Sequence, residues 1–453
     1  MMENSMSLPP VFPASALYDN LLQAALRQFF GRATFETEPI PSLSSDGRLA
    51  IEPTNDPSVL SIRWFGSRHV LHVPARRPFT KHEVRLARAI GTVLAARYRA
   101  IFDPKQMLER GELFRGSIED RYVSAFLDPV PMTDPSQSRA DLAATAIEVL
   151  RVAALSSYEN RAISSGVLLL GGLEDPVRAS TRPSGSEYRY SAALTGIKSF
   201  YRLCDGLRTL FLVNRDGAVL DIVEVQRYDH PAPLAVPCSI TYRSHARATV
   251  GNENISIVLS PTHEIKIFAE GKQVFSFRNA KWNLLDVEAK YEIWSYSLGN
   301  RALAERLFHT ALDLADSREG ALFVVLRDAA ASLPLLVAPG DQLDAIRVVG
   351  GEVPTRAQLM YMLRGRSVTD LDPAVLEGLA RTDGATVMDG SGRLLAVGAI
   401  LLHPEPLEPH SSLAVEGART TAAMAAGRYG AVLKVSEDGL ITFYDQQERI
   451  WDI

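Results

Sequence analysis

Hydrophobic and polar positions alternate with two different periods along the first 128 residues. Residues 16–30 and 79–99 carry apolar side chains at helical spacing, and Thr80 with Glu83 forms a capping box at the second helix. Shorter runs bounded by Gly, Asp and Pro predict strands at 49–51, 59–64 and 69–73. The pattern therefore predicts a small N-terminal α/β domain at residues 1–128.

After a linker rich in Pro, Ser and Asp at residues 129–137, the sequence predicts the same order of helices and strands twice. The first copy is expected to contain helices at 143–156 and 194–203 and strands at 166–170, 209–213, 218–225, 255–259, 265–268 and 273–277. The second is expected to contain helices at 300–314, 374–379 and 417–427 and strands at 321–326, 385–388, 393–402, 431–435 and, last, 440–444. Both copies place an Asp-Gly pair before a hairpin and an Ala-Arg-x-Thr segment before a later strand. We predict a degenerate internal repeat over residues 140–290 and 298–453, with chance recurrence of such units as the alternative.

Composition and charge narrow the class of protein. The chain has 453 residues, 46% of them hydrophobic and 22% charged, which suffices for folded cores and excludes a disordered chain. Its net charge of −5 disfavours a protein that binds nucleic-acid phosphates, and Cys204 and Cys238 form neither a disulfide framework nor a metal motif. Residues 1–13 lack the features of a signal peptide, and no apolar run approaches the roughly 20 residues of a membrane helix. We therefore expect a soluble, cytoplasmic protein with no membrane partner.

The second copy contains an Asp-Gly-Ala segment with the residue types of a catalytic turn. Asp383, Gly384 and Ala385 follow a predicted helix and open a buried strand. The carboxylate can point into a cleft there, and Gly384 permits the close approach of a ligand. An ordinary turn is the alternative interpretation of this segment. The corresponding Asp205-Gly206 of the first copy is interpreted as a turn, because Leu follows it where the second copy has Ala.

Two later segments of the second copy suit a phosphate group. Gly417 introduces an Ala-rich helix whose first turn carries Arg419, Thr420 and Thr421, and a helix N-terminus with hydroxyls and a guanidinium binds anions. Further on, residues 436–438 (Ser-Glu-Asp) end a strand with a hydroxyl and two carboxylates, which suit phosphate or a hard divalent cation. A packed helix and a polar hairpin are the alternatives.

These three segments, in this order, resemble the diadenylate cyclase (DAC) domain family. Members carry an Asp-Gly-Ala motif, a Gly-Thr-Arg-His-Arg-Ala-Ala motif and a strand ending in Ser-Glu-Glu. Here the first motif stands intact at 383–385, the second reads Gly-Ala-Arg-Thr-Thr-Ala-Ala at 417–423, and the third reads Ser-Glu-Asp at 436–438. The resemblance covers residues 298–453 and implies an α/β domain with a twisted, mixed central sheet flanked by helices. A degenerate related α/β repeat and a small N-terminal α/β domain would precede it.

The resemblance also implies an activity and roles for individual residues. Family members join two ATP molecules into cyclic di-AMP and release pyrophosphate with the help of Mn²⁺ or Mg²⁺. Asp383 would be the catalytic residue that acts on the ATP 3′-hydroxyl, and Asp438 would lie where the family has a metal-binding Glu. Nucleotide-binding roles are implied for Gly384, Ala385, Gly417, Arg419, Thr420, Thr421 and Ser436. Because ring closure needs two facing nucleotides, the resemblance implies a homodimer or higher homo-oligomer. The N-terminal region weakly resembles a GAF-type sensor domain, which implies a regulatory role.

Departures from the family motifs keep a second function open. Thr420 and Thr421 replace the family's His and second Arg, and Thr382 stands where the family often has a metal-ligating His. Each lost charged contact to phosphate costs about 1.5–3 kcal/mol. The alternatives are therefore a working diadenylate cyclase, a catalytically inactive nucleotide-binding sensor or receptor of the same fold, and an unrelated structural α/β domain.

Overall fold

The computed structural model describes most of the chain in two compact units. The described residues are 14–31, 33–39, 49–52, 54–64, 67–72, 78–102, 105, 110–133, 141–158, 161–173, 188–197, 200–346, 356–402 and 417–453. Unit 1 comprises residues 1–233 and 244–286, and unit 2 comprises residues 234–243 and 287–453. Residue 73 of the strand expected at 69–73 and residues 134–137 of the expected linker lie outside the described residues.

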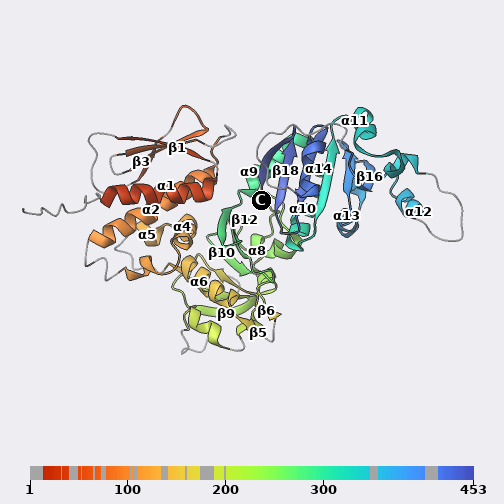
Figure 1. The fold of residues 1–453 in the computed structure, drawn as a ribbon. Coiled ribbons are helices and arrows are strands. Elements are labelled where there is room, and N and C mark those ends of the chain that lie inside the picture. Colours follow the sequence, from red (N-terminus) through yellow and green to blue (C-terminus); the bar gives the residue numbers. More distant parts are fainter. Residues whose placement is uncertain are drawn as a thin grey trace, which may run out of the picture. The chain divides into compact units, whose positions relative to one another are not determined.

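The N-terminal part of unit 1 is a four-stranded antiparallel sheet next to two long helices. The strands run in the order β1 (Thr34–Pro39), β4 (Ser67–His72), β3 (Val59–Trp64), β2 (Ala50–Glu52). Helices α1 (Ala14–Phe30) and α2 (Lys81–Phe102) lie along this sheet (Figure 1). The expected capping box is present, because the backbone N–H of Thr80 donates to Glu83 and that of Glu83 donates to the Thr80 hydroxyl.

The rest of unit 1 is built on a seven-stranded sheet. Its order is β13 (Lys281–Leu284), β12 (Lys272–Arg278), β11 (Ile265–Ala269), β10 (Ile255–Leu259), β7 (Ser165–Leu169), β8 (Thr209–Val213), β9 (Val219–Glu224). Only the pair β7 and β8 is parallel. The accompanying helices and short hairpin are α4 (Ile118–Leu127), α5 (Val130–Thr133), α6 (Leu142–Ala154), α7 (Phe200–Leu203), α8 (Arg243–Arg247), β5 (Ser157–Tyr158) and β6 (Arg161–Ala162). One buried apolar cluster runs from Tyr18 in α1 to Trp282 in β13, so both parts of unit 1 share a core.

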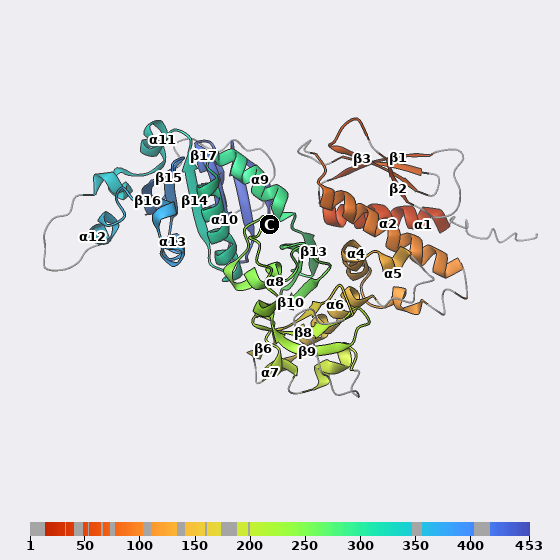
Figure 2. The same cartoon turned by 180° about the vertical axis from the view of Figure 1, so that it is seen from behind.

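Unit 2 is a six-stranded mixed sheet with helices on both faces. Its order is β16 (Leu394–Ala399), β15 (Ala385–Asp389), β14 (Ala321–Leu326), β17 (Gly430–Val435), β18 (Ile441–Asp445), β19 (Glu448–Asp452). The helices are α9 (Val287–Leu298), α10 (Arg301–Asp316), α11 (Ala329–Leu336), α12 (Arg356–Tyr361), α13 (Pro373–Ala380) and α14 (Ala418–Gly427) (Figure 2).

Seven 3₁₀ helices, distributed over both units, complete the described elements: η1 (Gly111–Phe114), η2 (Ala192–Gly196), η3 (Val225–Tyr228), η4 (Ile240–Tyr242), η5 (Pro339–Asp341), η6 (Leu343–Ala345) and η7 (Val368–Asp370).

Alternate residues of the unit 2 strands face different helices. Val432 shares an apolar cluster with Ala423 and Ala426 of α14, so even-numbered positions of β17 face α14. On the other face, Trp294 of α9 packs edge-to-face on Phe443 at 5.1 Å between ring centroids, a contact that stabilises by about 0.5–1.5 kcal/mol beyond its area. Helices α14 and α9 therefore cover opposite faces of the sheet.

The two large sheets have the same strand order and strand directions. In each, a central parallel pair (β7 with β8, β14 with β15) is followed by an antiparallel edge strand (β9, β16). On the other side of the central strand, successive antiparallel strands follow (β10 to β12, β17 to β19), and the first sheet adds β13. A helix lies between the edge strand and the next strand in both copies (α8, α14). The predicted element order thus recurs in both sheets, and a degenerate repeat over 140–290 and 298–453 stays a prediction.

Several elements differ from the expectations. The helix expected at 194–203 is instead the 3₁₀ turn η2 and the short α7, and Gly196 lies inside this stretch. The expected linker contains the helix α5. Strand β16 ends at Ala399, three residues earlier than expected, and 440–444 is not the last strand because β19 follows it. Among the described helices, none has the length and apolar composition to cross a membrane.

Candidate functional site

The topology of unit 2 brings the three polar segments to one edge of its sheet. Strands β14 and β15 are parallel, with Phe323 opposite Thr386, so both begin at the same edge. Strand β17 is antiparallel to β14, with Val435 opposite Ala321, so β17 ends at that edge. The Asp-Gly turn before β15 and the Ser-Glu-Asp turn after β17 therefore lie at a common edge, which we call the motif edge.

Asp383 lies exposed in the turn between α13 and β15. Within the part of the chain that the structure describes, its carboxylate has no hydrogen-bond or ion-pair partner. A carboxylate in this state can accept a proton or a hydrogen bond from a ligand. Its neighbour Thr382 is occupied locally, since its hydroxyl donates to the carbonyl of Leu379 at 2.7 Å.

Gly384 is needed for a reason different from the one that the sequence suggested. Its φ is +106°, and a Cβ at this position would lie 2.5 Å from the backbone carbon of Gly398 and 2.6 Å from the carbonyl oxygen of Ala399. The backbone of β16 thus passes directly over Gly384, where any side chain would clash. The glycine admits the neighbouring strand, which positions the Asp383 turn; the expectation that it admits a ligand stays a prediction.

Helix α14 presents its first turn at the motif edge. Gly417 is its N-cap and offers no side-chain cap, while the N–H groups of Thr420 and Thr421 donate to the carbonyl of Gly417. The Arg419 guanidinium extends to the start of β14, because a Cβ on Gly320 would lie 2.0 Å from its Nη1 atom. Arg419 Nη1 also donates to Glu437 Oε1 at 2.8 Å. The second and third segments are thus joined by an ion pair.

Sequence reasoning missed a further cation at this edge. Lys434 of β17 is only 8% exposed, and its Nζ donates to the Thr420 hydroxyl at 2.8 Å. It lies two residues after Val432, on the face of β17 that packs against α14. The period-2 pattern of this strand could have identified Lys434 as a charge directed toward the helix.

The Ser-Glu-Asp turn supplies a hydroxyl and carboxylates to the motif edge. Ser436 is half-buried, and its hydroxyl has no partner among the described residues. Asp438 is exposed and accepts from the Leu440 N–H at 3.2 Å. In the described chain, no group of three or more His, Cys, Asp or Glu side chains could hold a metal ion. One or two carboxylates here suit a cation that arrives already bound to phosphates.

The equivalent edge of the first copy is filled by the protein itself. The Asp205 carboxylate accepts the N–H groups of Leu207, Arg208 and Thr209 at 2.7–3.0 Å, the geometry of a closed turn. His245, at the start of α8, bonds the carbonyl of Gly206 through Nε2 at 3.0 Å. These bonds hold the Asp-Gly turn to the following helix.

The electrostatics of this filled edge suit a structural role. Burial lowers the pKa of His245 to about 4, against smaller opposing effects of the Gly206 carbonyl and the Asp205 charge. Burial raises the pKa of Asp205, but the hydrogen bonds from Thr209, Arg208 and Leu207 outweigh it and the pKa is lowered. At neutral pH the histidine is therefore uncharged and the aspartate ionised, with its Oδ1 atom bound to the backbone of its own turn. The interpretation of Asp205-Gly206 as a turn agrees with this geometry.

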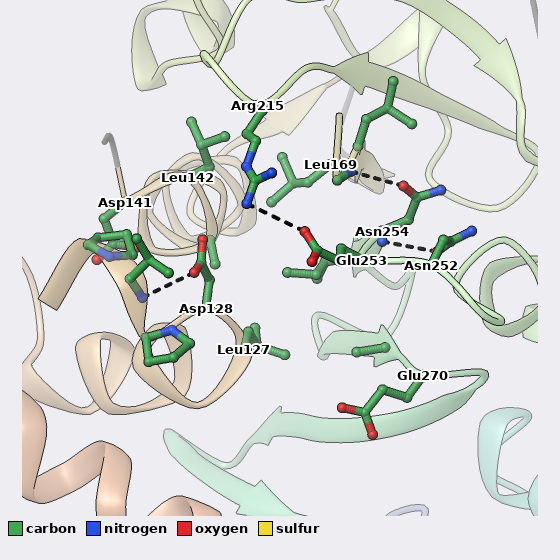
Figure 3. Close-up of a pocket in the computed structure, with 18 of the residues that line it drawn as sticks. Leu127, Asp128, Asp141, Leu142, Leu169, Arg215, Asn252, Glu253, Asn254 and Glu270 are labelled. Carbon is green, nitrogen blue, oxygen red and sulfur yellow. Dashed lines mark hydrogen bonds and ion pairs between the residues drawn. The ribbon is translucent and has the colours of Figure 1, made fainter. Parts of the chain in front are cut away.

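A pocket of about 340 Å³ lies elsewhere in unit 1 and contains none of the predicted site residues (Figure 3). Its polar groups bind one another: Arg215 lies 3.4 Å from Glu253, and the Asn254 side chain accepts from the Gly171 N–H at 3.0 Å. The Asn254 amide also donates to the Ala248 carbonyl at 3.1 Å. With these donors and acceptors satisfied internally, the pocket offers less to a ligand than the motif edge does.

Comparisons with known proteins do not show a family for this chain. No family model matches the chain, and no curated protein matches it. Among solved structures, it is similar to a hypothetical membrane spanning protein from Bacillus cereus, with 19% identity and a TM-score of 0.22 over 33% of this chain and 62% of that one. It is also similar to DacA from Staphylococcus aureus, with 18% identity and a TM-score of 0.22 over 33% of this chain and 86% of that one. The chain thus spans less than two thirds of the first protein's length, and scores this low establish no common fold.

Proposed function

We propose that the motif edge of unit 2 binds nucleoside triphosphates and that the protein is a diadenylate cyclase-like nucleotidyltransferase. The observation that carries the proposal is the convergence of three separated segments, each resembling a motif of that family, at one edge of one sheet. The product would be cyclic di-AMP or a related cyclic dinucleotide, with regulation by the N-terminal region.

In this proposal, Asp383 acts on the nucleophile. The ATP 3′-hydroxyl gives its proton to the Asp383 carboxylate as its oxygen forms a bond to the α-phosphorus of a second ATP. The bond between the α-phosphorus and the bridging oxygen breaks, and pyrophosphate leaves. The exposed carboxylate, which has no partner among the described residues, supports this role.

The triphosphate would be held by the first turn of α14 and by the turn after β17. Arg419 provides a guanidinium for bidentate contact with phosphate, and the helix dipole adds positive potential at the same end. Ser436 contributes a hydroxyl. These groups position the α-phosphorus and stabilise negative charge in the transition state, which are the main contributions of proteins to phosphoryl chemistry.

The carboxylates present fit Mn²⁺ or Mg²⁺ that enters with the nucleotide. Asp438 and Asp383 are the residues that would contact it, as hard oxygen donors at an exposed edge. Neutralisation of phosphate charge is the chemistry that such an ion supplies when bound.

A catalytically inactive nucleotide receptor is the second candidate. Thr420 and Thr421 supply no charge where the resembled motif has His and Arg, which favours binding without turnover. Incubation of the whole chain with labelled ATP and Mn²⁺ separates the two. Cyclic product that disappears in Asp383→Asn supports the cyclase, whereas ATP binding with no product supports the receptor. Absence of both binding and product would overturn the proposal.

Ring closure also has a consequence for assembly. Two nucleotides must face each other, and in the first copy Asp205 Oδ1 and the Gly206 carbonyl are already bound within the protein. We therefore expect two chains to meet through their motif edges, as in the common two-fold dimers. Product formed per chain should rise with protein concentration and then level off. Constant activity per chain across dilution, with only monomer in sedimentation, would exclude this arrangement.

A further inference from the structure

The pocket of unit 1 lies at the carboxyl ends of the two parallel strands of the seven-stranded sheet. Leu169, the last residue of β7, lines it, and so does Arg215, which follows the end of β8 at Val213. Ile255, the first residue of β10, pairs with Leu169 and lines the same side. Open α/β sheets commonly bind ligands outside the carboxyl ends of their strands, so the pocket has the position of a ligand site.

The walls of the pocket are largely apolar. Side chains from α4, α5, α6, β7, β10 and β11 line it: Leu127, Val130, Leu142, Leu169, Ile255 and Ala269. Its volume of about 340 Å³ is at the lower end of the range of small-molecule pockets, roughly 300–1,000 Å³. At the packing density of protein interiors, this volume suits a molecule of about ten to fifteen non-hydrogen atoms.

The polar groups around these walls have partners within the protein. Arg85 Nη1 donates to Glu270 Oε1 at 2.5 Å, and Arg121 Nη1 donates to Asp141 Oδ2 at 2.7 Å. The arginine and asparagine side chains at the other side of the pocket bind one another or the backbone, as described above. A polar ligand would have to replace such bonds, whereas an apolar ligand leaves them intact.

The charge of the lining excludes one class of ligand. Four residues with carboxylates line the pocket against two with guanidinium groups: Asp128, Asp141, Glu253 and Glu270, with Arg85 and Arg215. The Asp128 and Glu253 carboxylates come from opposite sides of the pocket (Figure 3). This surplus of negative charge disfavours an anion such as a nucleotide or a carboxylate.

We propose that the unit 1 pocket binds a small, uncharged and largely apolar molecule of about ten to fifteen non-hydrogen atoms. Burial of its apolar surface against the leucine and isoleucine walls provides the affinity, and the surplus of carboxylates provides selectivity against anions. The site is separate from the motif edge of unit 2, and the proposal does not depend on nucleotide binding there.

Calorimetry on the whole chain with indole and with indole-3-propionate tests the proposal. Indole is an uncharged apolar probe of suitable size, and we expect one molecule to bind per chain. Indole-3-propionate carries the same ring with a carboxylate, and it should bind at least about tenfold more weakly because of the negative charge of the lining.

Two variants that fill the pocket locate the binding site. Ala269→Leu on β11 and Val130→Phe on α5 add volume from two different walls, and each should weaken indole binding at least about tenfold. Ala24→Leu is the matched control, because it adds the same volume at an exposed position of α1, and it should bind indole like wild type. Circular dichroism identifies a variant that does not fold, and the other filling variant then decides.

Three results would each overturn the inference. The first is a wild type that does not bind indole, and the second is equal affinity of the wild type for indole and indole-3-propionate. The third is a folded filling variant that binds indole like wild type, which would place the probe elsewhere on the chain. None of these results bears on the proposed nucleotide site, so the two proposals fail independently.

Discussion

Replacing His82 should remove most of the alkaline pH dependence of unit 1 stability. His82 lies on α2, with Nδ1 2.9 Å from Asp286 Oδ1 and Nε2 3.8 Å from Glu270 Oε2. Burial lowers its pKa, but the hydrogen bond to Asp286, the contact with Glu270 and the charge of Asp286 outweigh burial and a small opposing effect of Lys272, raising the pKa from 6.5 to about 8. The ring of Phe126 packs against it at 5.9 Å between centroids.

The size and sign of the effect follow from this pKa. A change from 6.5 to about 8 corresponds to about 2 kcal/mol, at about 1.4 kcal/mol per pH unit. Because the folded state holds the proton more tightly, this stabilisation is complete below pH 6.5 and is lost as pH rises through 8. The contact with His82 is also the main reason that the pKa of Glu270 is lowered to about 2. Because both pKa shifts include this same contact, their energies are not added.

Urea unfolding of the whole chain at several pH values, followed by tryptophan fluorescence, measures this effect. Between pH 6 and 9, the free energy of unfolding of unit 1 should fall by about 2 kcal/mol in the wild type and stay nearly level in His82→Gln. His72→Gln serves as a control, because His72 lies on β4 outside this cluster, and should keep the wild-type slope. Equal slopes in the wild type and His82→Gln would refute the reasoning.

Two further predictions concern the motif edge. Gly384→Ala should destabilise unit 2 by about 3 kcal/mol or more in urea unfolding, because its φ is +106° and the added Cβ would meet the backbone of Gly398. Gly378→Ala on α13 is the control and should be neutral or slightly stabilising, because open space surrounds that position. Equal stability of the two variants would contradict the close packing of β16 on Gly384. Glu437→Gln should raise ATP affinity up to about fivefold in calorimetry, because an exposed ion pair of at most about 1 kcal/mol no longer competes for Arg419, and a weakened affinity would show that Glu437 helps to bind the ligand.

Strands with predominantly apolar sequences could be predicted from the sequence with near-exact bounds. Residues 209–213, 255–259 and 321–326 are short apolar runs between turns, and each is a strand with those bounds. Such runs form strands because they can be buried on both faces at the centre of a sheet. Charged and polar edge segments gave no such signal: β19 (Glu448–Asp452) has a single buried residue, and β1 (Thr34–Pro39) has none.

Helix α9 was missed because its apolar positions are aromatic and sparse. Its buried residues, Val287, Tyr291 and Trp294, do lie at helical spacing, but Glu, Lys and Ser separate them and two exposed hydrophobic residues, Ile293 and Tyr296, blur the period. Trp294 packs on Phe443 and Tyr291 packs on Phe308, and tertiary contacts of this kind are not visible in a local sequence pattern.

Individual residues of the candidate site could be predicted from the sequence only where they belong to a family motif. Asp383 and Arg419 were identified in that way, and the structure places their segments at one edge. Lys434 belongs to no motif; it became visible when strand pairing directed its side chain toward α14. The predicted close approach of a ligand to Gly384 stays a prediction. The structure shows a different reason for the glycine, the passage of β16, which is a contact between segments about 14 residues apart that the sequence alone does not reveal.

Photolabelling tests most directly the claim that the motif edge binds nucleotide. The whole chain is irradiated with an azido-ATP in the presence of Mn²⁺, with and without excess ATP, and the labelled peptides are identified by mass spectrometry. Label that ATP suppresses should fall on peptides containing residues 383–385, 417–423 or 434–438. Label confined to the unit 1 pocket, around Arg215 and residues 252–255, or label that ATP does not suppress, would contradict the assignment.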